Sequence, residues 1–120
     1  MNAPEVLIIC RRAPYASSAA RDAIDVALSC ALFALPVTLL LLDDAVLQLL
    51  PEQQSGGIGQ KNPNAMLGVL PMYDIDRLYT STQSLALHGL EDVRLDPAPI
   101  VLDQAEIRAL LARHPRVIML

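Results

Sequence analysis

Solid apolar runs alternate with longer amphipathic segments along most of this chain. Residues 5–10 (EVLIIC) and 37–42 (VTLLLL) are nearly continuous apolar runs, which are typical of strands buried on both faces of a parallel sheet. Between them, apolar residues recur every three or four positions up to about Ala34, and Ser17 and Ser18 offer an N-cap. The first third of the chain therefore predicts one long helix between two buried strands.

The rest of the chain continues this alternation in shorter pieces. We expect further strands at 75–79, 100–102 and 117–120, a short extended piece at 93–95, and helices at 45–50, 63–72, 80–90 and 103–113. Residues 52–62 are polar and hold three of the five glycines, which predicts a loop. The predicted fold class is α/β, a single domain over residues 1–120 with a mainly parallel five-stranded sheet and helices on both faces.

Residues 73–90 carry the densest local signals. The spacing Thr80-x-x-Gln83 predicts a capping box at the start of a helix. Gly89 stands where a left-handed C-cap residue is expected, and Leu90 is placed for the hydrophobic contact of a Schellman motif. In open α/β sheets, ligands bind where the carboxyl end of a strand leads into a helix, so this unit is the first place to look for a site.

Composition adds a question about burial. Apolar residues make up 53% of the chain and charged residues only 18%, so we expect part of the surface to be buried in an oligomer or a membrane. The longest uncharged run, 26–42, is interrupted by Pro36 and has no flanking basic cluster, which argues against a membrane span. The net charge of −4 argues against direct nucleic-acid binding.

The two cysteines, Cys10 and Cys30, have neither CxxC nor metal-ligand spacing. Free thiols and a short polar N-terminus predict a cytoplasmic protein. The glycines of 52–62 lack the Lys-Ser/Thr ending of a phosphate-binding loop, so the sequence predicts no cofactor and no metal.

Several polar residues are predicted to converge at the carboxyl edge of the sheet and to contact an anion or a partner: Arg11, Arg12, Ser17, Thr80, Ser81 and Thr82. Helix caps and solvated loop charges explain the same residues more simply. Cys10 has two interpretations as well. The neighbouring arginines would lower the pKa of a reactive thiol, whereas a cysteine at the end of a strand is more often a small buried residue.

Three segments resemble the TusC/DsrF branch of the DsrE/F/H-like sulfur-relay family: APYASSAARDAIDVAL (13–28), LDDAVLQLLP (42–51) and LPMYDIDRLY…SLALHGL (70–90). The resemblance runs nearly end to end and implies a small flavodoxin-like or DsrE/F/H-like α/β subunit. In the tRNA-thiolation branch, TusB, TusC and TusD form a heterohexamer, a dimer of heterotrimers, which passes persulfide sulfur towards the wobble uridine. The resemblance thus implies TusB-like and TusD-like partners, and the sequence leaves open whether the chain forms a homo-oligomer when it is made alone.

One position departs from the catalytic pattern of this family. The relay cysteine of TusD/DsrE-type subunits falls on Ser81, and a hydroxyl cannot carry a persulfide. We therefore expect no catalytic residue and no enzyme activity of the chain alone, and a TusC-like structural role in 2-thiouridine formation. The alternatives are a thiol-based sulfur carrier acting through Cys10, a DsrF-like subunit in sulfur oxidation, and an anion- or nucleotide-binding module.

Overall fold

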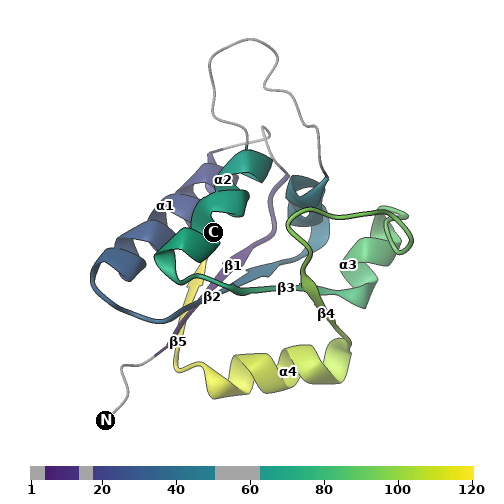
Figure 1. The fold of residues 1–120 in the computed structure, drawn as a ribbon. Helices are drawn as coiled ribbons and strands as arrows, with labels where there is room; N and C mark the ends of the chain where they lie inside the picture. The colour runs from purple at the N-terminus through teal and green to yellow at the C-terminus, as the bar shows by residue number, and fades with distance from the viewer. Residues whose placement is uncertain (1–4, 14–17, 51–62) are drawn as a thin grey trace.

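The computed structural model describes residues 5–13, 18–50 and 63–120 (Figure 1). The strands are β1 (Val6–Cys10), β2 (Val37–Leu41), β3 (Arg77–Ser81), β4 (Ile100–Leu102) and β5 (Arg116–Met119). The helices are α1 (Ala19–Leu32), α2 (Pro63–Val69), α3 (Thr82–Leu87) and α4 (Gln104–Arg113), and two 3-10 helices are η1 (Asp43–Leu49) and η2 (Leu70–Tyr73). The predicted α/β class and the five strands are confirmed.

All five strands are parallel and lie in the order β4-β3-β2-β1-β5. The fully apolar β1 and β2 occupy the inner positions and are buried along their whole length, as the solid apolar runs predict. Because the first strand lies between the second and the fifth, the order differs from that of flavodoxin, in which β1 lies between β2 and β3.

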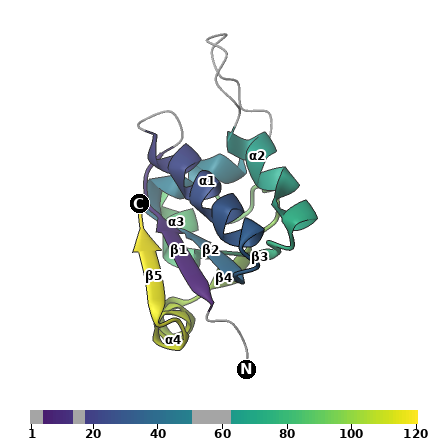
Figure 2. The same cartoon turned by 90° about the vertical axis from the view of Figure 1, so that its left-hand side faces the viewer.

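The direction of the crossovers decides which helices cover which face. The chain moves from β1 through β2 and β3 to β4 in one direction and then returns across the sheet to β5. When all crossovers are right-handed, two crossovers that run in opposite directions along the sheet place their helices on opposite faces. Accordingly, α1 and α2 lie together on one face and α4 lies on the other (Figures 1 and 2). The second face is therefore covered by one helix of ten residues.

Each face of the sheet has its own apolar core. Side chains of β1 alternate between them: Ile8 packs with Ile24 and Leu39 under α1, whereas Leu7 packs with Leu40 and α4. A third apolar cluster joins η1 to α3 at the carboxyl edge of the sheet; its buried members are Val46, Leu85 and Leu90.

The predicted Schellman motif at the end of α3 is present. Gly89 has a φ of 64°, its N–H donates to Ala86 O at 3.1 Å, and the N–H of Leu90 donates to Leu85 O at 2.8 Å. Leu85 and Leu90 then meet in the third cluster, which is the hydrophobic contact expected of this motif. The capping box that begins α4, formed by Asp103 and Glu106, is also present.

The predicted strand at 75–79 begins two residues later, and the capping box at Thr80 is wrong. The N–H of Ile75 donates to Leu70 O at 3.1 Å and closes η2, so Ile75 is used in a turn before the strand starts. Thr80 is consequently a buried residue inside β3, and its hydroxyl donates to Leu41 O at 2.7 Å. The cap of α3 moves one residue on, to Ser81.

Other local predictions also need correction. Helix α1 ends at Leu32 because Ala34 is left-handed with φ 57° and the N–H of Leu35 donates to Cys30 O, a Schellman ending without glycine. Ser18 stands at the N-cap, but its hydroxyl contacts Asp22 at 2.9 Å instead of a backbone N–H. The expected helix at 45–50 is the 3-10 helix η1, and 93–95 forms no strand.

Two further predictions concern the loop at 52–62 and the absence of a membrane-spanning helix. The loop expected at 52–62 lies outside the described residues. Among the helices of the described ranges, none combines the length and apolar content that a membrane span requires.

Glu5 joins three elements at the amino edge of the sheet. Its carboxylate lies 2.6 Å from Arg77 Nη1 at the start of β3 and 2.9 Å from Nε2 of His114, which ends α4. The hydrogen bond from Arg77 is the largest cause that holds the pKa of Glu5 below its usual value of 4.5. Glu5 must therefore lose a proton more readily in the folded state than in the unfolded chain.

This lowered pKa predicts a pH dependence of stability. The contribution of Glu5 is complete above the unfolded pKa of about 4.5 and is lost as the pH falls through the lower folded pKa. Urea unfolding should show Glu5→Gln less stable than the wild type at pH 7, with the difference shrinking as the pH falls below about 4.5. A difference that is independent of pH would show that the carboxylate charge is not the cause.

Candidate functional site

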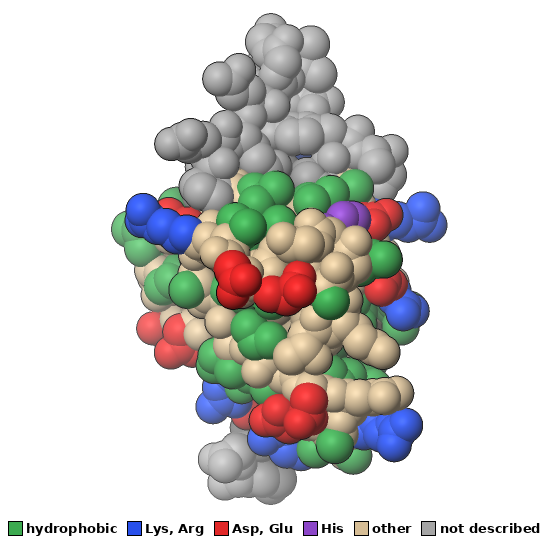
Figure 3. Space-filling model, turned by 90° about the vertical axis from the view of Figure 1, so that its right-hand side faces the viewer, with side chains coloured by type: hydrophobic (Ala, Val, Ile, Leu, Met, Phe, Trp, Pro, Cys, Tyr) green, Lys and Arg blue, Asp and Glu red, His purple; other side chains and the backbone are tan. Residues whose placement is uncertain are grey.

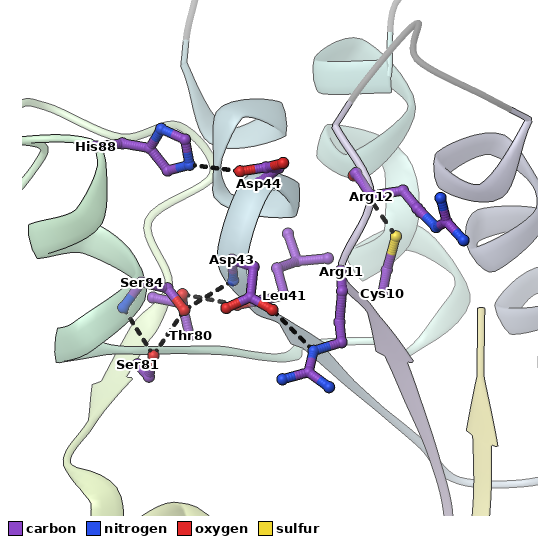
Figure 4. A network of polar contacts seen from close by, with 10 residues as sticks. All are labelled: Cys10, Arg11, Arg12, Leu41, Asp43, Asp44, Thr80, Ser81, Ser84 and His88. Atoms are coloured by element: carbon purple, nitrogen blue, oxygen red, sulfur yellow. Dashed lines mark hydrogen bonds and ion pairs between the residues drawn. The ribbon is translucent and has the colours of Figure 1, made fainter.

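The predicted site residues divide between two places at the carboxyl edge of the sheet (Figure 4). Ser81 ends β3 and caps α3, Thr82 begins α3, and Arg11 follows β1. These three residues line one cavity. Thr80 does not line this cavity, because its hydroxyl donates to Leu41 O within the sheet. Arg12 lies near Cys10, whose sulfur contacts its backbone O. Ser17 lies outside the described residues.

The Ser81 hydroxyl is fully engaged within the protein. Its oxygen accepts from the Ser84 N–H at 3.0 Å, and its hydrogen is placed to donate to Ser84 Oγ at 2.8 Å. Ser84 Oγ also accepts from the Asp43 N–H at 2.8 Å, so the two serines connect α3 to η1 (Figure 4). The Ser81 hydroxyl thus has a structural role, and His88 contacts Asp44 at 3.0 Å.

Arg11 is held by an ion pair rather than left free for an anion. Its Nε lies 2.8 Å from Asp43 Oδ2, and both side chains are about half exposed. Exposed pairs of this kind contribute about 1 kcal/mol or less to stability. The pair still leaves the two outer guanidinium nitrogens turned away from Asp43 (Figure 4).

A cavity of about 670 Å³ lies between α3 and α4. Its walls combine apolar side chains from both helices with the polar edge of the sheet; they include Leu42, Ala86, Leu87, Gln104, Ile107 and Arg108. The α4 residues were not predicted as part of the site, because no local signal in the sequence brings 104–108 next to 81–87. The signal that was available is the capping box at Asp103, which places the first turn of α4 at the end of β4.

The surface around this cavity is not basic. Figure 3, which looks from the side of α3, shows acidic and apolar side chains mixed over the described part of this face, with Arg side chains at its margins. A nucleic-acid interface would instead present clustered positive charge.

The surroundings of Cys10 are not those of a reactive thiol. The side chain is fully buried, and burial is the largest cause that raises the pKa of the thiol above its usual value. Its sulfur accepts a weak hydrogen bond from Gln48 Nε2 at 3.7 Å and donates a weak one to Arg12 O at 4.0 Å. Desolvation outweighs the lowering of the pKa by the charge of Arg12, so the net shift is opposite to that of a reactive thiol and agrees with the alternative of a small buried residue. Cys30 packs partly buried against the first core.

We also searched the described residues for side chains that could together hold a metal ion. Within the described ranges, no three His, Cys, Asp or Glu side chains are grouped closely enough to hold a metal ion.

Three comparisons with known proteins agree with one another. A family model described as the DsrE/DsrF-like family matches residues 5–120. A "Protein TusC homolog" from Pseudomonas aeruginosa is 44% identical over 115 residues, which cover 96% of this chain and 97% of that protein. Another "Protein TusC homolog", from Vibrio parahaemolyticus, is 33% identical over 98 residues, 80% of this chain and 83% of that protein. The crystal structure of the ychN protein from E. coli matches with a TM-score of 0.85 over 98% of this chain and 99% of that chain; at 19% identity it shows a shared fold.

Proposed function

The chain belongs to the DsrE/DsrF-like family, and from this membership we propose that it is a TusC-like, non-catalytic subunit of a sulfur-relay complex. One observation carries the proposal. At the position of the relay cysteine the chain has Ser81, whose hydroxyl is used as a helix cap and as a donor to Ser84. A side chain that can neither form a persulfide nor act without a base supports a structural role.

The finer statements of the proposal follow from the resemblance. The chain, acting as one DsrE/F-like domain over residues 1–120, assembles in the cytoplasm with TusB-like and TusD-like subunits in a heterohexamer that serves 2-thiouridine formation at the tRNA wobble position. A DsrF-like subunit of a sulfur-oxidation complex is the alternative within the same family. The apolar content of 53% supports an assembly of either kind. Arg11, Ser81 and Thr82 are proposed to face a partner or an anion through the cavity that they line.

Native mass spectrometry tests this role directly. The chain is co-expressed with TusB-like and TusD-like chains of the same genome, and the complex is measured before and after loading with persulfide sulfur. A mixed assembly with added sulfur only on the TusD-like subunit supports the proposal. Added sulfur on this chain that disappears in Cys10→Ser would favour the thiol-carrier alternative instead.

Ser81→Ala separates a structural from a catalytic role. Loss of the cap is expected to lower the free energy of unfolding by about 1 kcal/mol. Sulfur transfer by the assembled complex, measured as persulfide passed to the next acceptor, should stay within about three-fold of the wild type because no reacting atom has been removed. A loss of activity by orders of magnitude in an intact complex would contradict the non-catalytic role.

A further inference from the structure

Five large apolar side chains are exposed together at the amino edge of the sheet, on the side of α1 and α2. They come from the end of α1 and from α2 and η2, and we call them the α1–η2 surface: Leu32, Phe33, Val69, Met72 and Tyr73. Phe33 and Met72 keep 80% and 82% of their surface exposed. Helix α1 packs against both α2 and η2, and Figures 1 and 2 both place the C-terminal ends of these segments next to each other.

The backbone that presents these side chains is fixed by hydrogen bonds. Phe33 is followed by the left-handed Ala34, and the N–H of Leu35 donates to Cys30 O at 3.0 Å. Met72 lies in η2, which is closed by the Ile75 N–H donating to Leu70 O at 3.1 Å. A rigid apolar surface loses little conformational entropy when a partner covers it, which favours binding.

The size of the surface suits one half of a protein interface. Exposed fractions of this magnitude on five large side chains leave apolar area on the order of 600 Å² uncovered. Such an area is at the upper end of what a free monomer shows, and a standard interface buries about 800 Å² on each partner.

Charge around the surface indicates what kind of partner fits. Asp74 and Asp76 are exposed and directly follow Tyr73, the last residue of η2. The next cation along the chain, Arg77, is paired with Glu5 at 2.6 Å, so the border of the surface near η2 is acidic. A second copy placed face to face would bring these acids together, and like charges across an interface are unfavourable. The surface therefore fits a different chain, one with an apolar face bordered by Arg or Lys.

We propose that the α1–η2 surface is the docking face for one such partner: a different subunit of the complex, whose own apolar face is bordered by Arg or Lys. This inference rests on the proposed function, because it takes its partner from the complex proposed above. It adds the face through which the chain assembles, which lies at the opposite end of the strands from Ser81 and its cavity.

Substitution of single apolar residues of the α1–η2 surface by aspartate tests the proposal. Phe33→Asp and Met72→Asp are compared with Met119→Asp, a control at an exposed methionine on β5. The three variants are co-expressed with the TusB-like and TusD-like chains and measured by native mass spectrometry and by titration of purified subunits. Both surface variants should bind the partner about 30-fold more weakly or worse, with far-UV circular dichroism and melting like the wild type, and Met119→Asp should bind normally. If Phe33→Asp does not fold, Met72→Asp alone decides the result.

A charge reversal supplies an independent reading. Asp74→Lys should weaken assembly several-fold at low salt and less at high salt, whereas Asp92→Lys, in the loop after α3, should have no effect. Equal assembly of all variants would overturn the docking face while leaving the proposed function intact. A wild-type chain that does not assemble would overturn both. A homodimer disrupted by Phe33→Asp would show that the occupant is a second copy.

Discussion

Leu40→Ala is expected to lower the free energy of unfolding by about 3 kcal/mol. Leu40 is fully buried in the middle strand of the sheet and packs with Leu7, Ile9 and Leu110. Among the described residues, α4 is the one helix that covers this face, so no second described helix can move into the space that the leucine leaves. The expected loss is a large part of the roughly 5–15 kcal/mol that stabilises a domain of this size.

Urea unfolding followed by circular dichroism at one protein concentration measures this loss. Leu32→Ala serves as the matched control, because the same change at a side chain that is 77% exposed should alter the free energy of unfolding by about 0.5 kcal/mol or less. A cost below about 1 kcal/mol for Leu40→Ala would mean that α4 does not seal the second core as described.

The second large effect concerns the reactivity of Cys10. In the native protein, its alkylation by iodoacetamide at pH 7.5 should be on the order of 100-fold slower than in urea, because a thiolate must form in a buried site. Burial raises the pKa of this thiol, so the neutral form prevails at that pH, and the fully covered sulfur is reached only after local opening. Cys30, which is only partly buried, should be slowed less.

Peptide mass spectrometry after timed alkylation gives both rates in one sample. Cys30→Ser and Cys10→Ser assign the signals and show whether one thiol affects the other. Alkylation of Cys10 at the same rate with and without urea would reopen the thiol-carrier alternative, since that function requires an accessible thiolate near neutral pH.

The apolar pattern predicted the fold well because buried parallel strands have few alternatives. The run from Val6 to Cys10 is apolar at every position, and only a strand covered on both faces needs this. The Schellman ending at Gly89 was equally predictable, since its left-handed residue and following leucine are local signals.

The sequence was less informative where two local signals competed. Thr80 and Ser81 can both cap a helix, and the choice was decided by Leu41 O, which is supplied by the neighbouring strand and accepts the Thr80 hydroxyl. The pKa of Cys10 depends likewise on how completely the surrounding elements bury it, and adjacent arginines in the sequence say nothing about that. The cavity required knowing that α4 returns across the sheet, which is a property of the topology.

The pairing of β5 with β1 has a consequence for how the chain is made. Val6 pairs with Arg116, so β1 leaves the ribosome long before β5, its second neighbour in the sheet, has been translated. Until then β1 has β2 on one side and an unpaired, entirely apolar edge on the other, which is the kind of edge that joins foreign strands. The newborn chain is therefore exposed to aggregation until β5 has been made, and translation that stops before β5 is expected to yield insoluble product.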